Sequence, residues 1–188
     1  MKLRLFLLGI VCICLCVPYI RCFFKRLNLF FKIKKVCLEK GHILTGTHRF
    51  WWLGDKAGKN CDCVIETAEE RFAVKLFGMP RRKCVLVFTE NKEFFIRRFL
   101  FLVDGRFLLW IRETFESKAK PFPEYDFSFK QKENPSDKEL RKILLINPVP
   151  IDMLMQEKVG KERTVIPGDE VYGMQIANQS WLLKELTK

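Results

Sequence analysis

Three residues in one short stretch have the types that metal-dependent hydrolysis uses. In the sequence CDCVIETAEERFAVKLF, Asp62 and Glu66 lie four residues apart, and Lys75 follows in the next apolar run. Side chains alternate along a strand, so both carboxylates would project from one face. Converging carboxylates can hold a divalent cation, and a nearby lysine can act on the attacking water or on a phosphate. The stretch is therefore a candidate catalytic site.

The same stretch resembles the hairpin of the PD-(D/E)XK nucleases. In that family an acid begins one strand, the next strand carries acid-x-lysine, and together they bind a divalent metal and orient water. Asp62 and Lys75 match two of these positions, but Ala73 stands where the second acid belongs, and Glu66 would have to replace it. The family usually has a helix straight after this lysine, which the sequence does not predict here. The competing interpretation is a solvated hairpin face with cross-strand ion pairs.

No other pattern in the sequence predicts a catalytic centre or a cofactor. A nucleophile elbow, a phosphate-binding loop and a nucleotide-binding glycine pattern are all missing. A zinc site would have to combine the C-x-C pair with more distant residues, and that spacing differs from the usual C-x₂₋₄-C. The residues concerned are His42, His48, Cys61, Cys63 and Cys84. We therefore predict no metal site and interpret the cysteines as small buried apolar side chains.

A second candidate site is basic. Residues 81–112 contain eight Lys or Arg and three acids, interleaved with Phe and Trp. Such a surface could contact acidic lipid headgroups or a nucleic acid, or it could be the solvated face of a sheet. Adjacent arginines must point to opposite faces of a strand, so one of Arg97 and Arg98 would lie near an apolar face. The candidate binding residues are Arg81, Arg82, Lys83, Arg97 and Arg98.

An apolar segment precedes the elements that would position these residues. Leu5 to Ile20 is a run of sixteen residues without a charge, somewhat shorter than the roughly 20 residues that span a bilayer. We predict a transmembrane signal-anchor over residues 1–24, with a cleaved signal peptide or a buried or interfacial helix as the alternatives. More bases follow the run than precede it, so the positive-inside rule places the body in the cytoplasm. The expected localisation is a single-pass protein of the cell membrane.

Residues 25–40 are expected to form a basic amphipathic juxtamembrane segment. Residues 1–40 contain nine Lys or Arg and one acid, and so carry +8 of the chain's net charge of +12. Clustered bases beside an apolar segment attract anionic lipid, at roughly 1 kcal/mol per base. A cytosolic continuation of the anchor helix is the alternative. The membrane-surface candidates are Arg21, Lys25, Arg26, Lys32, Lys34 and Lys35.

Residues 41–188 are expected to form a soluble α+β domain, with an antiparallel β-meander followed by two C-terminal helices. The strand-rich part, 42–112, contains one hairpin that turns at 68–70 and another that turns at Asp104-Gly105. Residues 113–136 are rich in proline and charge and predict a loop. In the mixed part, 137–188, a capping box at Ser136 and Glu139 predicts a helix that ends by Asn147. A second helix is expected at about 177–186.

These features favour a membrane-anchored, cytoplasm-facing binding or accessory module without catalytic activity. Membrane lipids and a protein are the expected partners, and nucleic acid is a less favoured one. The alternative is a diverged metal-dependent nuclease-like enzyme. The two hypotheses differ in geometry, because the nuclease requires Asp62, Glu66 and Lys75 to converge in one concave site, whereas the binding module expects them along an exposed face.

Overall fold

The computed structural model describes residues 24, 26–46, 60–79, 84–102, 111–127, 138–157 and 160–188. This part of the chain is mostly β-structure, in two sheets of six strands each. It also contains two short helices. The first, here called the N-terminal helix, comprises Phe24 and residues 26–40, and the second is α3 (Gln179–Glu185).

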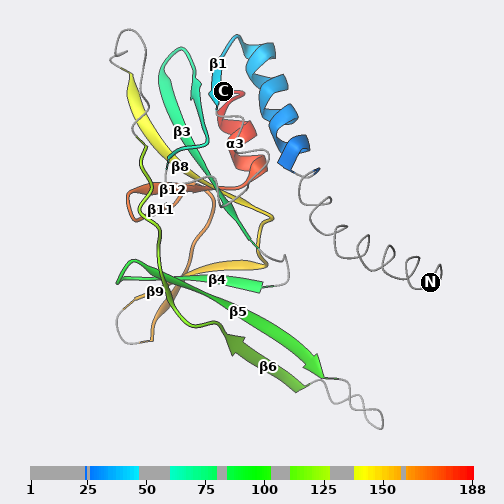
Figure 1. Cartoon of the computed structure of the whole chain (residues 1–188), viewed down its shortest axis with the longest axis vertical. Helices are drawn as coiled ribbons and strands as arrows, with labels where there is room; N and C mark the ends of the chain where they lie inside the picture. The colour runs from blue at the N-terminus through cyan, green and yellow to red at the C-terminus, as the bar shows by residue number, and fades with distance from the viewer. Residues whose placement is uncertain are drawn as a thin grey trace, which may run out of the picture.

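The first sheet has parallel strands at its centre (Figure 1). In spatial order the strands are β1 (Ile43–Gly46), β2 (Cys63–Glu66), β3 (Glu70–Gly78), β8 (Glu139–Asn147), β12 (Met174–Ala177) and β11 (Glu170–Val171). Strand β8 pairs in parallel with β3 on one side and with β12 on the other, and the outer pairs are antiparallel. A central parallel strand has both faces covered, which fits the continuous apolar run at 143–146.

The second sheet contains one parallel pair, β4 with β9, and is otherwise antiparallel. In spatial order its strands are β10 (Glu162–Thr164), β9 (Asp152–Gln156), β4 (Cys84–Thr89), β5 (Glu93–Leu102) and β6 (Ile111–Glu116), and β7 (Lys120–Pro121) also pairs with β5. Strands β5 and β6 pair antiparallel, but with Leu102 opposite Ile111, whereas a two-residue turn at 104–105 would place 103 opposite 106. The loop predicted over 113–136 is wrong in part, because β6 continues to Glu116 and β7 lies at Lys120–Pro121. The turn predicted at Asp104-Gly105 lies outside the described residues.

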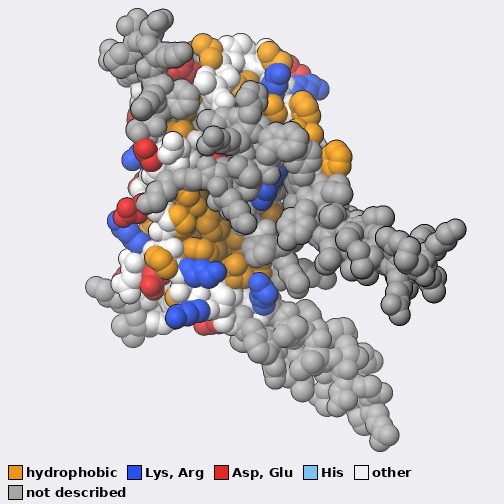
Figure 2. Space-filling model, viewed as in Figure 1, with side chains coloured by type: hydrophobic (Ala, Val, Ile, Leu, Met, Phe, Trp, Pro, Cys, Tyr) orange, Lys and Arg blue, Asp and Glu red, His pale blue; other side chains and the backbone are white. Residues whose placement is uncertain are grey.

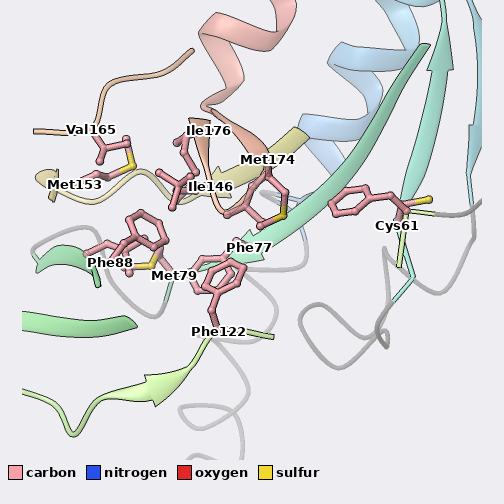
Figure 3. Close-up of a cluster of buried hydrophobic side chains, with 14 of the residues drawn as sticks. Cys61, Phe77, Met79, Phe88, Phe122, Ile146, Met153, Val165, Met174 and Ile176 are labelled. Carbon is pink, nitrogen blue, oxygen red and sulfur yellow. The ribbon is translucent and has the colours of Figure 1, made fainter. Parts of the chain in front are cut away.

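Two large apolar clusters hold the described elements together. The larger one lies between the sheets and combines Phe77 and Ile176 of the first sheet with Phe88 and Met153 of the second (Figure 3). Phe122, from the segment after β7, packs against Phe77 with their ring centroids 5.8 Å apart. The other cluster covers the opposite face of the first sheet, where the N-terminal helix and α3 contribute their buried side chains. The first sheet is therefore the middle layer.

The predicted fold class, α+β with a meander and two C-terminal helices, is wrong. Residues 139–147, expected to be a helix, form strand β8, and the sheets contain parallel pairs that a meander lacks. The side chains of residues 143–146 are all buried, on both faces of the strand. Tertiary burial therefore overrides the local capping signal. The first hairpin (β2–β3) and helix α3 were predicted correctly.

The predicted transmembrane helix, and with it the single-pass localisation with a cytoplasmic body, is contradicted as well. Of the helices in the described part of the chain, none is both long and apolar enough to cross a bilayer. The N-terminal helix carries Arg26 and four lysines and packs one of its faces against the first sheet. The uncharged run at residues 5–20 itself lies outside the described residues.

Candidate functional site

The hairpin of β2 and β3 brings Asp62 and Lys75 together. The backbone N–H of Asp62 donates to the carbonyl of Val74 at 2.8 Å, which places Asp62 beside β3. Lys75 Nζ lies 3.2 Å from Asp62 Oδ1 and donates to the carbonyl of Asn60 at 2.8 Å. The second carboxylate oxygen, Oδ2, accepts from the backbone N–H of Leu76 at 2.8 Å. Both oxygens of the carboxylate are thus engaged by the protein itself.

This pair is buried. Lys75 is 2% exposed and Asp62 3%, and the Lys75 ammonium lies 5.2 Å from the centre of the Tyr125 ring. Buried charges persist when they are paired and their remaining hydrogen-bonding capacity is used, because each would otherwise bear the cost of desolvation. The arrangement is that of an internal ion pair, which a substrate does not reach without rearrangement.

Glu66 does not join this pair. It lies at the other end of β2, where its Oε1 is 2.6 Å from an Nη atom of Arg71. Ala73, at the position of the family's second acid, is fully buried in the core between the sheets. Among the residues that the structure describes, no three His, Cys, Asp or Glu side chains lie close enough to hold a metal ion. Two of the three candidate residues converge, but they form no open carboxylate site.

The basic candidate residues do not form one binding surface in the described part of the chain. Arg97 on β5 lies 2.8 Å from Glu116 and 2.7 Å from Glu162, so two carboxylates occupy its guanidinium. The hydrogen bond from Arg97 lowers the pKa of Glu162. Arg98, the next residue on β5, is exposed. Residues 81–83 lie outside the described residues, so the predicted basic site is not seen as one surface.

The N-terminal helix has two different apolar faces. Leu29, Ile33 and Cys37 are at most 3% exposed and belong to the cluster on the first sheet. The opposite face carries large apolar side chains that are largely exposed: Phe24 at 60%, Phe31 at 55% and Leu38 at 71%. We call these three residues the outer stripe. Figure 2 shows hydrophobic side chains along this helix, at the upper right, with Lys and Arg side chains beside them.

Lysines flank the outer stripe. Lys32, Lys34 and Lys35 are all exposed, and Lys35 is 3.7 Å from Glu39, the nearest acid on the helix. Arg26 is partly exposed, whereas Arg21 and Lys25 lie outside the described residues. Sequence reasoning recognised the helix as basic and amphipathic, but it did not separate the buried face from the exposed one. The signal was present, because the outer stripe repeats every seven residues, or two helical turns.

The described cysteines and His42 lie in surroundings that indicate a structural role. Cys37, Cys61, Cys63 and Cys84 are free and buried, as expected for small apolar side chains. Burial raises the pKa of the Cys37 thiol to about 11 and also raises that of Cys63, which keeps both thiols protonated and unreactive. A ring nitrogen of His42 lies 2.9 Å from the carbonyl of Leu186. His48 lies outside the described residues.

Comparison of the chain with protein-family models, curated proteins and solved structures finds no match in any of the three. Function is therefore inferred from the side chains alone. Of the candidate surfaces, the outer stripe of the N-terminal helix with its lysines has the clearest chemistry, because it offers apolar contact and positive charge to a partner.

Proposed function

We propose that the protein is a non-catalytic binding module that attaches to the surface of an anionic membrane through the outer face of its N-terminal helix. The supporting observation is the division of that helix into a face buried against the first sheet and an exposed face carrying the outer stripe. Interfacial helices place an apolar stripe at the boundary between headgroups and acyl chains, with lysines at its sides. This attachment is peripheral.

Apolar and electrostatic contributions both favour such docking. Full burial of a Phe or Leu side chain stabilises by about 1.5–3 kcal/mol, and a lysine near an anionic surface adds about 1 kcal/mol. Because the opposite face of the helix packs on the body, the helix is already ordered and loses little conformational entropy on docking. The expected attachment is reversible and weakens as salt screens the lysines.

The absence of catalysis is proposed from the hairpin. Asp62 and Lys75 satisfy each other in a buried pair, Glu66 is engaged by Arg71, and Ala73 offers no ligand to a metal. A diverged nuclease would need converging carboxylates that a substrate can reach. Incubation of the full chain with DNA or RNA and Mg²⁺ or Mn²⁺ tests this point. Cleavage that is lost in Asp62→Ala/Lys75→Met, while that variant still unfolds cooperatively, would overturn the proposal.

Vesicle flotation of the full chain tests the docking face. We expect binding to vesicles of phosphatidylserine and phosphatidylcholine, and a loss of about tenfold or more in the variant Phe31→Ser/Leu38→Ser, because it removes two apolar anchors. The matched control is Ile151→Ser/Ile166→Ser, which replaces apolar residues that are 64% and 58% exposed elsewhere. The control should bind like the wild type, and both variants should keep its melting temperature.

Two results would contradict the docking face. One is wild-type binding by Phe31→Ser/Leu38→Ser, which would show that the outer stripe does not contact lipid. The other is equal binding to vesicles of phosphatidylcholine alone, which would show that the exposed lysines do not contribute.

A further inference from the structure

A small cleft lies at the edge of the core between the sheets. Four aromatic side chains contribute to its lining, from the segment after β7 and from the turn between β11 and β12, and two of them are largely buried: Phe122, Tyr125, Phe127 and Tyr172. The rings pack closely, with centroids 5.7 Å apart for Phe122 and Tyr125 and 5.1 Å apart for Phe122 and Tyr172. The cleft encloses about 200 Å³, a small volume compared with the roughly 300–1,000 Å³ of pockets for drug-sized ligands.

The rim of the cleft is positively charged. Lys92 and Lys142 line it and are exposed, and no ion pair or side-chain hydrogen bond joins their ammonium groups to another described residue. Glu124 is the acid among the lining residues. The two lysines come from distant parts of the chain, the turn between β4 and β5 and strand β8. They leave two cations beside an aromatic wall, opposed by one carboxylate.

The backbone at the cleft is held in an uncommon conformation. Lys92 and Tyr172 are the non-glycine residues with positive φ in the described chain, at 55° and 54°, and both line the cleft. Such backbone conformations are strained for residues with a side chain and tend to occur at binding sites. The Tyr172 hydroxyl lies 2.8 Å from the carbonyl oxygen of Glu93 and 3.0 Å from the amide nitrogen of Thr89. The turn that carries Tyr172 is thus fixed to the turn that carries Lys92.

We infer that this cleft binds a small aromatic acid, with one planar ring against the aromatic wall and a carboxylate facing Lys92 and Lys142. A single ring suits the volume, and aromatic rings attract one another in edge-to-face or offset contacts. Next to the wall, the Cβ that a side chain at Gly173 would add meets no atom within 4 Å. The site is independent of the proposed membrane docking, because none of its lining residues belongs to the N-terminal helix.

Titration of the full chain with 4-hydroxyphenylacetate, followed by calorimetry or ligand-observed NMR without lipid, tests the inference. We expect saturable binding that weakens about tenfold or more in Lys92→Glu/Lys142→Glu, since the variant replaces two charged hydrogen-bond donors to the carboxylate with like charges. The neutral analogue 4-methylphenol should also bind more weakly. The control Lys118→Glu/Lys161→Glu reverses two exposed lysines outside the cleft and should bind like the wild type.

The inference is overturned by either of two outcomes. The wild-type chain shows no saturable binding of 4-hydroxyphenylacetate, or the variant Lys92→Glu/Lys142→Glu binds it as tightly as the control does. Because all four substituted lysines are exposed, the variants should fold, and an unchanged melting temperature verifies this. Vesicle flotation is measured separately, so failure of this site would leave the docking proposal standing.

Discussion

The ammonium of Lys75 and the carboxylate of Asp62 leave water together when the hairpin of β2 and β3 folds. Their separation of 3.2 Å, with additional hydrogen bonds to Asn60 and Leu76, compensates part of the desolvation cost that both charges incur. Neither partner can then be removed alone without leaving the other charge buried. We therefore interpret the pair as a structural ion pair of the protein interior.

Single and double substitutions should reveal this dependence. Asp62→Ala leaves the Lys75 charge uncompensated, so we expect it to lower the free energy of unfolding by about 3–5 kcal/mol. Asp62→Ala/Lys75→Met removes both charges and should be less destabilising than Asp62→Ala alone. Urea denaturation of the full chain measures both, with the exposed Glu69→Ala as the control.

An additive result, in which the double variant is less stable than either single variant, would contradict a buried ion pair. The approach of Asp62 to Lys75 could be predicted from the hairpin pattern and the alternation of side chains along a strand. Their burial could not, because the groups around the pair include Tyr125, which lies 5.2 Å from the Lys75 ammonium and fifty residues beyond it in the sequence. A local pattern contains no information about such a distant neighbour.

Elements were predictable where local pattern and tertiary context agree. The β2–β3 hairpin has apolar runs on both sides of a polar turn, and α3 has Asn178 as an N-cap whose side chain accepts from the N–H of Trp181. For β8, the local pattern and the tertiary context disagree. Its sequence contains a helix-like start, but its four buried apolar residues, 143–146, occupy a central strand between β3 and β12. Parallel pairing joins segments far apart in the chain, so it leaves no short-range signal.

Arg97 joins three strands of the second sheet and makes their stability depend on pH. It extends from β5 to Glu116 on β6 and to Glu162 on β10. The hydrogen bond from Arg97 lowers the folded-state pKa of Glu162 below the roughly 4.3 of an unfolded glutamate. The ionised Glu162 therefore stabilises the fold above the unfolded pKa, and this contribution is lost as pH falls through the folded pKa.

Melting temperatures of Glu162→Gln and the wild type, compared across the acid range, test this linkage. At neutral pH the variant should be the less stable protein, and the difference should shrink as the pH falls below about 4. The partly exposed pair is screened by water, so the effect at neutral pH should be modest. Glu157→Gln, at an exposed acid just beyond β9, serves as the control. A difference that is constant with pH would exclude a contribution from the ionisation of Glu162.

The part of the chain that the structure describes is organised around one sheet that is covered on both faces. The second sheet packs on one face, and the N-terminal helix and α3 pack on the other (Figure 1). The outer stripe and the aromatic cleft then lie in different layers, one on the helix and one between the sheets. This separation allows the two proposed sites to act independently.

Because both sheets contribute to the cluster between them, they should unfold as one cooperative unit. Leu86→Ala, at a fully buried position of β4 in this cluster, should lower the free energy of unfolding by about 2–5 kcal/mol, because it leaves a cavity. Native-state hydrogen exchange then separates local from global effects. The slowest amides of β3 and β8 in the first sheet should lose as much protection as those of β4. The control is Ile151→Ala, at an exposed position. It should change the protection of the amides in neither sheet. If the amides of β3 and β8 kept their protection in Leu86→Ala, the two sheets would be separate folding units, and the cluster between them would not couple their stabilities.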